Sequence, residues 1–332
     1  MKSTFLKSTA ILLIITFSSC QNSTKNKENT ENSNLEQSAS DTRTEKAQER
    51  LEKVPKEMRN SDLFSTEIIK PTQLFDNVYY IGYVGVGVFL INTADGLILI
   101  DSMWNQNDAE TVIVPGIKEL GFDPAQVKKI LITHEHSDHY GGARFFEKNY
   151  GSEVLMSKTA WEGLHSNDAE VLTDPFGNLS SELEVPKKYT EVKNGENISL
   201  GDKSITVYLT PGHAPGGLSL LFPVEEQGEK YTVALWGGTG LPKTLAANEN
   251  YLSSLKMFQD AANNAEADVN LSNHPFTIGL VKDMETLRSN APGDKNPLIK
   301  GNKNFNEYID AKLKPKVLEK IQELKSEKEK NN

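Results

Sequence analysis

The chain has very little cysteine and no apolar run long enough to span a membrane. Cys20 is the only cysteine among 332 residues, so an intramolecular disulfide is impossible. The apolar run that ends at Phe17 is too short for a permanent membrane span, and no later stretch approaches the roughly 20 apolar residues that such a span needs. We therefore expect neither a disulfide-stabilised core nor a transmembrane helix.

Positive charge is also scarce. The sequence has 36 lysines and arginines against 46 acidic residues, which gives a formal net charge of −10. Residues 1–19 hold two lysines and no acids, so the chain without them has a formal charge of −12. An excess of negative charge argues against nucleic acid as a partner.

The first 19 residues have the composition of a secretion signal. Lys2 and Lys7 precede an apolar run that ends at Phe17, and two serines then lead to Cys20. This arrangement resembles a bacterial lipoprotein processing site. We therefore expect an exported protein that is periplasmic or held at the outer membrane through a lipid on Cys20. The alternative is that Cys20 is an ordinary residue of a cleaved secretory peptide.

The next 40 residues differ sharply in composition from the rest. They are rich in serine, asparagine, threonine, glutamate and lysine, and they cannot bury enough surface to offset the entropy lost on ordering. The sequence therefore predicts a signal peptide over residues 1–19, a disordered tether over residues 20–60 and one folded domain over residues 61–332.

Within the domain, runs of β-branched and apolar residues alternate with segments of helical spacing. Strands are expected at residues 78–81, 86–91, 97–100, 130–133, 153–156, 205–209, 218–222, 232–235 and 269–271. Helices are expected at residues 107–121, with Asn107 as N-cap and a kink at Pro115, at 251–263 and at 313–330. Hairpins mixed with helical crossovers predict an α/β fold with two sheets covered by helices on their outer sides.

One segment concentrates metal-binding side chains. Residues 133–142 read THEHSDHYGG, which places three imidazoles and two carboxylates within six residues after an expected strand. On an extended backbone His134 and His136 project to the same side and can share one ion. Asp138 and His139 lie beyond them, on the turn into a helix, and can serve a neighbouring ion. Neutral imidazole and carboxylate ligands suit zinc, and few structural needs explain this pattern.

Two more histidines follow expected strands in loops. His213 ends the sequence TPGH, and His274 lies in SNHP. A lone loop histidine is usually exposed, but these two are nearly all the histidines that remain outside the cluster. The exception, His165, has no candidate ligand nearby, and we expect it at the surface or in a pocket wall.

The sequences THEHSDHYGG, TPGHAPGG and SNHP, in that order, resemble the signature loops of the metallo-β-lactamase superfamily over about residues 63–310. The resemblance implies a four-layered α/β/β/α sandwich with the metals at one edge. Asp101, at the end of the strand over residues 97–100, matches a family aspartate that buttresses the metal loop. The resemblance also implies two zinc ions, one held by His134, His136 and His213 and the other by Asp138, His139 and His274.

The residues after the strand expected at 232–235 indicate which branch of the superfamily the chain resembles most. Many family members, including glyoxalase II and lactonases, carry a metal-bridging aspartate there, whereas residues 235–240 read LWGGTG. The lack of this acid and of a cysteine ligand most resembles the third subclass of class B β-lactamases. That likeness implies hydrolysis of a β-lactam ring, a small-molecule substrate, by a metal-bound hydroxide. Asp138 would orient the nucleophile, and Trp104 and Thr239 are candidate pocket residues.

Two alternatives stay open. Members with the same ligands need not hydrolyse lactams, so the substrate could be another cyclic amide, a lactone or a thioester. A protein of another class, a zinc-binding surface lipoprotein without turnover, would also carry these residues. Chelation would abolish a reaction in the first case and only binding in the second. Membrane contact is expected only through the lipid anchor, and the sequence leaves the oligomeric state open.

Overall fold

The computed structural model describes residues 61–165, 184–291 and 293–331. The chain divides into a unit of residues 1–46 and a unit of residues 47–332, and every described residue belongs to the second unit. The predicted signal peptide, Cys20 and the tether lie outside the described residues. Among the helices that are described, none combines the length and the apolar character needed to cross a bilayer.

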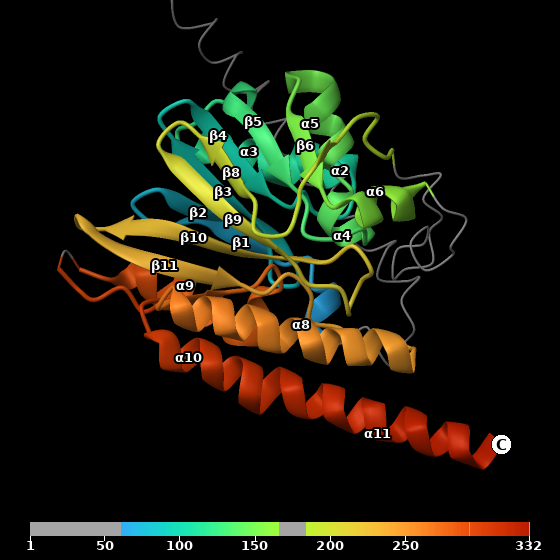
Figure 1. Cartoon of the computed structure of the whole chain (residues 1–332). Helices are drawn as coiled ribbons and strands as arrows, with labels where there is room; N and C mark the ends of the chain where they lie inside the picture. Colours follow the sequence, from blue (N-terminus) through green and yellow to red (C-terminus); the bar gives the residue numbers. More distant parts are fainter. Residues whose placement is uncertain (1–60, 166–183, 292, 332) are drawn as a thin grey trace, which may run out of the picture. The chain divides into compact units, whose positions relative to one another are not determined.

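Two β-sheets form the centre of this unit (Figure 1). The first sheet is antiparallel from β1 to β4 and parallel from β4 to β7. In spatial order its strands are β1 (Ile68–Phe75), β2 (Val78–Tyr83), β3 (Gly87–Thr93), β4 (Gly96–Ile100), β5 (Val127–Leu131), β6 (Glu153–Met156) and β7 (Thr190–Glu191). The second sheet has the spatial order β12 (Val269–Leu271), β11 (Glu229–Leu235), β10 (Leu218–Glu226), β9 (Lys203–Leu209) and β8 (Asn197–Leu200).

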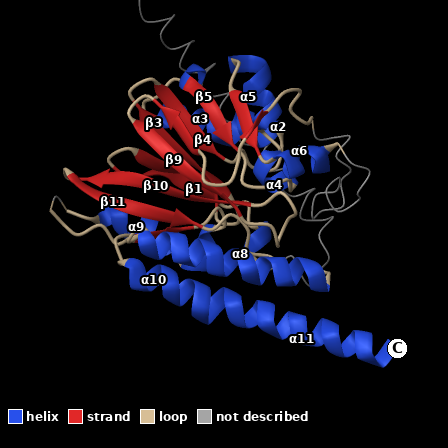
Figure 2. Ribbon diagram, viewed as in Figure 1, coloured by secondary structure: helices blue, strands red, loops and turns tan. Residues whose placement is uncertain are grey.

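Helices connect and cover the strands (Figure 2). Those before the second sheet are η1 (Asp62–Phe64), α2 (Gln106–Asp108), η2 (Ala109–Ile113), α3 (Val114–Glu119), η3 (Pro124–Gln126), α4 (Ser137–Tyr140), α5 (Ala143–Tyr150) and α6 (Lys158–Leu164). Those after it begins are α8 (Leu245–Asn264), η5 (Pro275–Ile278), α9 (Leu280–Ser289), α10 (Asn302–Glu307), η6 (Tyr308–Leu313) and α11 (Lys314–Asn331).

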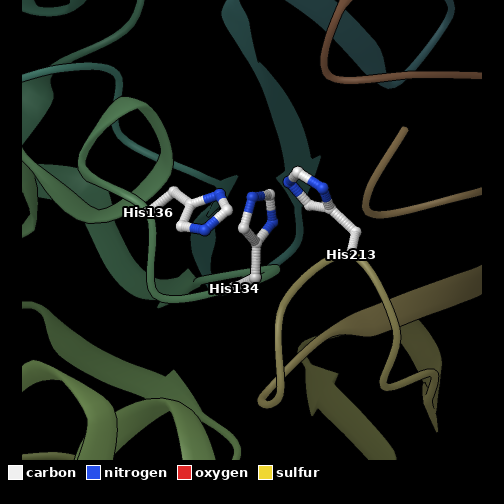
Figure 3. Close-up of side chains that lie close together, drawn as sticks. All are labelled: His134, His136 and His213. Atoms are coloured by element: carbon white, nitrogen blue, oxygen red, sulfur yellow. The ribbon is translucent and has the colours of Figure 1, made fainter. Parts of the chain in front are cut away.

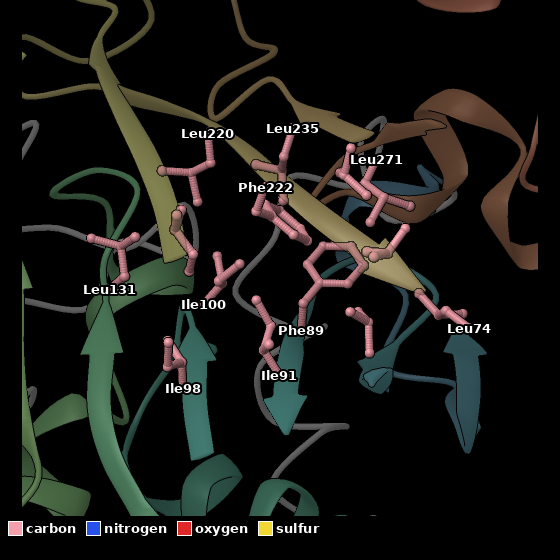
Figure 4. Packing of buried hydrophobic residues seen from close by; sticks show 14 of the residues in the cluster. Leu74, Phe89, Ile91, Ile98, Ile100, Leu131, Leu220, Phe222, Leu235 and Leu271 are labelled. Carbon is pink, nitrogen blue, oxygen red and sulfur yellow. The ribbon is translucent and has the colours of Figure 1, made fainter. Parts of the chain in front are cut away.

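The alternation of side chains along the strands explains the layers. In β4, Leu97 and Leu99 pack against the helices that cover the first sheet, whereas Ile98 and Ile100 pack between the two sheets. Figure 4 shows this central layer, in which side chains of both sheets interdigitate. A third cluster joins the outer face of the second sheet to α8 and α11, which run side by side in Figure 1. The predicted α/β/β/α sandwich is therefore confirmed.

The prediction of Asn107 as a helix N-cap is wrong. The cap is Asn105, whose side chain accepts a hydrogen bond of 3.0 Å from the amide of Asp108. The predicted single helix is also divided, because a π-helical turn, η2, precedes α3. Pro115 lies in the first turn of α3 and has no amide hydrogen to continue the regular pattern.

The strand predicted to reach Thr133 ends at Leu131. At Thr133 the backbone is instead held by other parts of the fold. The Thr133 amide donates to the Asp101 carboxylate at 2.7 Å, and the Thr133 carbonyl accepts from the amide of Leu218 at 2.7 Å. Asp101 follows β4, and Leu218 begins β10 in the other sheet. The loop after β5 is thereby fixed at an edge where both sheets meet.

Candidate metal centre

Three histidines converge at this edge. His134 and His136 come from the loop after β5, and His213 comes from the loop between β9 and β10 (Figure 3). Each offers a ring nitrogen, and these three nitrogens lie within 4.8 Å of one another. Ring centroids are 4.7 Å apart for His136 and His213, and 4.8 Å apart for His134 and each of the other two.

A second group lies directly beside the first. Ligand atoms of His134, Asp138 and His139 also fall within 4.8 Å of one another. The Asp138 Oδ2 atom is 3.3 Å from His139 Nε2 and 3.7 Å from Nε2 of His274, which follows β12. The structure thus brings together all six side chains that the sequence proposed as ligands.

Backbone and carboxylate oxygens orient the rings. Nδ1 of His213 is 2.9 Å from the Gly240 carbonyl oxygen, and Nδ1 of His274 is 2.8 Å from that of Gly85. Nδ1 of His139 is 2.8 Å from Asp101 Oδ2. Hydrogen bonds of this kind fix the tautomer of a ligand histidine and leave Nε2 for the metal.

Buried nitrogens without a partner show that these residues fit a metal ion. Nε2 of His134 and Nε2 of His139 are buried, and neither has a hydrogen-bond partner among the described residues. A buried polar atom without a partner is costly, and native proteins rarely keep one. A cation coordinated by these nitrogens would satisfy both.

The electrostatics also favour a cation. Burial lowers the pKa of His134 well below its usual value, and the neighbouring imidazoles lower it further, so this ring is neutral as a ligand must be. Burial opposes charge on His139 as well, yet the carboxylates of Asp138 and Asp101 raise its pKa to about 10. Burial likewise opposes the charge on Asp138, but His139 and His274 hold the pKa of this carboxyl well below its usual range. The carboxylates of Asp138 and Asp101 therefore stabilise positive charge at this part of the site.

Asp101 is the hub of the hydrogen bonds beneath the site. Its side chain is fully buried, and its backbone adopts the left-handed region with φ of 63°. Oδ1 accepts from the amide of Thr133, and Oδ2 accepts from the Thr133 hydroxyl at 2.9 Å, from His139 and from Nδ2 of Asn273 at 3.0 Å. The carboxylate thus links the ends of β4, β5 and β12 to one ligand.

Sequence reasoning assigned no role to Asn273 or to Glu135. Both are buried, with 0% and 1% of their surface exposed. Asn273 donates to Asp101, and Glu135 accepts from the amide of Gly216. In the sequence, the only sign of a role was that Asn273 and Glu135 each stand next to a candidate ligand histidine. Their hydrogen-bond partners lie 172 and 81 residues away along the chain.

The remaining predicted residues lie outside the two groups of candidate ligands. Trp104 is 3% exposed and packs in the hydrophobic layer between the first sheet and its helices. Thr239 is half-buried between two glycines whose α-carbons both face the His213 ring. His165 is exposed, and its Nδ1 is 2.9 Å from the Trp161 carbonyl oxygen. It belongs to neither group of candidate ligands among the described residues.

Two positions after β11 have no room for a side chain. A Cβ at Gly237 would collide with the carbonyl oxygen of Leu218, and this backbone atom cannot move aside as a flexible side chain could. A Cβ at Gly238 would lie 2.7 Å from Cδ2 of His213, closer than real contacts allow. Neither position can accept a side chain in this structure.

Comparison with known proteins agrees with this geometry. A model of the metallo-beta-lactamase superfamily matches residues 82–226, which include the loops of five of the six candidate ligands. The chain carries a metallo-β-lactamase superfamily domain. It is similar to BJP-1, a subclass B3 metallo-β-lactamase of Bradyrhizobium japonicum, with 28% identity and a TM-score of 0.66 over 79% of this chain and 97% of that chain.

Two other relatives of this superfamily domain differ in the activity that their names describe. FEZ-1, a metallo-β-lactamase from Legionella gormanii, is 23% identical, with a TM-score of 0.68 over 78% of this chain and 98% of that one, and this likeness shows the fold. The N-acyl homoserine lactonase AttM of Rhizobium radiobacter is 27% identical over 186 residues, which are 53% of this chain and 68% of the lactonase. The matched domain is thus similar to those of metallo-β-lactamase superfamily hydrolases.

Proposed function

We propose that the protein hydrolyses the amide bond of a β-lactam ring. The observation that carries this proposal is the absence of an acid from residues 235–240 after β11, where Gly237 and Gly238 have no room for a side chain. The second group of ligands would then consist of Asp138, His139 and His274, the set that resembles the third subclass of class B β-lactamases. The similarity to BJP-1, which extends over almost all of that enzyme, supports the same substrate class.

The cofactor that fits these residues is a pair of zinc ions. His134, His136 and His213 would hold one ion, and Asp138, His139 and His274 would hold the other. Zinc bound in this way lowers the pKa of a coordinated water to about 7 and polarises a carbonyl oxygen. Nitrogen and carboxylate oxygen are donors that zinc accepts readily, and no sulfur ligand is needed.

The chain's own residues would position the reacting groups. Asp138 is 6% exposed, and its lowered pKa keeps it a carboxylate at neutral pH, so it can accept a hydrogen bond from the attacking water and orient it. Thr239, beside His213, offers a hydroxyl for a polar group of the substrate. Attack on the lactam carbonyl carbon breaks the bond to nitrogen, and the nitrogen takes up a proton. No covalent intermediate with the protein is required.

Lactone ring opening is the second candidate, because the lactonase AttM is among the relatives. A lactone offers a similar carbonyl but an oxygen leaving group. The two proposals are separated by assaying the zinc-loaded protein side by side on a carbapenem, a cephalosporin, an N-acyl homoserine lactone and a thioester. Preference for either lactam by tenfold or more in kcat/KM supports the proposal, and preference for the lactone or the thioester overturns it.

We also propose that the protein acts outside the cytoplasm, anchored by a lipid on Cys20. The basis is the sequence of residues 1–20, which lie outside the described residues.

A further inference from the structure

Glu135 is a buried carboxylate between two candidate ligands, and the catalytic proposal gives it no role. Its carboxylate receives the amide hydrogen of Gly216, at 2.9 Å from Oε1 and 3.2 Å from Oε2. Only 1% of the residue is exposed. Burying a carboxylate is costly unless its hydrogen bonds serve the fold or the site.

Gly216 lies three residues after His213, in a loop that connects β9 to β10. The loop sequence PGHAPGG has three glycines, which make an isolated backbone flexible. Gly216 itself is tightly packed, since a Cβ there would collide with the backbone nitrogen of Ala160 at the start of α6. Its carbonyl accepts from the Ser157 hydroxyl at 2.8 Å. Gly216 is therefore held at both of its backbone groups, its amide by Glu135 and its carbonyl by Ser157.

Other hydrogen bonds that hold this loop come from backbone groups or from other elements. At its base the amide of Leu218 bonds the carbonyl of Thr133, and near its start Ser254 bonds the carbonyl of Pro211 at 2.8 Å. From the segment bearing His134 and His136, the Glu135 side chain reaches this loop with a hydrogen bond to its backbone. It joins two loops that come from different sheets and that must place three nitrogens within 4.8 Å.

We propose that Glu135 is a positioning residue, which sets the distance of His213 from His134 and His136 by holding the amide of Gly216. This inference rests on the proposed metal centre but not on the proposed substrate. The role needs a hydrogen-bond acceptor of the right length, whereas the negative charge itself is not required. Outer partners of metal ligands typically change metal affinity by about 10- to 100-fold when removed.

Three substitutions separate reach from charge. Glu135→Gln keeps the length and an acceptor oxygen but removes the charge. Glu135→Asp keeps the charge but is one methylene shorter, so it does not reach Gly216. Glu135→Ala removes both. Ser152→Ala is the matched control, because the Ser152 side chain is also buried and also bonds the backbone: its hydroxyl donates to the Val127 carbonyl at 2.6 Å, at the opposite end of β5 from the metal loop.

The test measures Zn²⁺ affinity by competition with a chromophoric chelator, and ligand geometry from the visible absorption of bound Co²⁺, on the full chain without substrate. We expect Glu135→Asp and Glu135→Ala to bind Zn²⁺ about tenfold or more weakly with an altered Co²⁺ spectrum. Glu135→Gln and Ser152→Ala should stay within about threefold of the parent. If Glu135→Ala does not fold, the Gln and Asp variants carry the comparison.

Two results would overturn the proposal. Unchanged affinity in Glu135→Asp would show that the contact does not position His213. A loss in Glu135→Gln as large as that in Glu135→Asp would show that the negative charge is required, whereas the proposal requires only an acceptor of the right length. A parent chain that binds Zn²⁺ but leaves every lactam intact would contradict the proposed function and leave this inference standing.

Discussion

Asp101→Asn tests how the hydrogen bonds beneath the site support the metal. Asparagine also tolerates the left-handed backbone at φ of 63°, so the substitution changes the side chain without straining the turn. The wild-type carboxylate accepts four hydrogen bonds, three of them on Oδ2. An amide offers one oxygen and one NH₂ group, so at least one buried donor faces an NH₂ group and loses its acceptor.

The size of the effect follows from that count. Each buried group left without a partner costs about 1–3 kcal/mol, so we expect a loss of about 2–4 kcal/mol in the free energy of unfolding. For a domain of this size such a loss lowers Tm by roughly 5–15 °C. His139 also loses the acceptor that fixes its ring, so Zn²⁺ affinity and kcat/KM should fall by about 10- to 100-fold.

Calorimetry and chelator competition on the same samples measure both quantities. Asp108→Asn is the control, because Asp108 is also buried, at 1% exposure, accepts from the Tyr83 hydroxyl at 3.1 Å, and belongs to α2, which holds none of the candidate ligands. It should lower Tm and leave Zn²⁺ affinity within about threefold. The reasoning is refuted if Asp101→Asn binds Zn²⁺ as tightly as the parent chain does.

Three further substitutions give independent checks. His136→Ala should lose one zinc ion and nearly all activity while remaining folded, because His136 is only half-buried. Metal analysis and circular dichroism measure the zinc content and the folding of the variant. An active variant with full zinc would contradict the assignment of His136 as a ligand. Gly237→Ala should destabilise the protein by about 1–3 kcal/mol or more, because the added methyl meets the Leu218 carbonyl; an unchanged denaturation midpoint would argue against this packing. Cys20→Ser should move the protein from the membrane to the soluble fraction, and continued membrane association would exclude the proposed anchor.

The side chains that the structure brings together could be chosen from the sequence, because the spacing of most of them is local. The motif over residues 133–142 fixes four of them within six positions, and the two loop histidines were left as the obvious complement. Asp101 was also singled out, because it matches a family aspartate at the end of β4. Strands made of short apolar runs, such as β4 and β6, were predicted to within a residue.

What escaped prediction depends on contacts between distant segments. The bonds of Asn273 to Asp101 and of Glu135 to Gly216 arise only when the two sheets come together. β1 was missed because Pro71 interrupts its pattern, and this strand lies at the sheet edge with an irregular register between Ile69 and Thr72, where proline is tolerated. β7 has only two residues, too few for any period to appear.

The most direct test of the central claim is carbapenem turnover as a function of bound zinc. The chain from residue 20 onward would be stripped of metal, loaded stepwise with Zn²⁺ and followed by absorbance, with a chelator-treated sample alongside. The account predicts turnover that rises with bound zinc, reaches a kcat/KM of about 10⁴ M⁻¹s⁻¹ or more, and disappears on chelation. A fully zinc-loaded protein that leaves the lactam ring intact would contradict it.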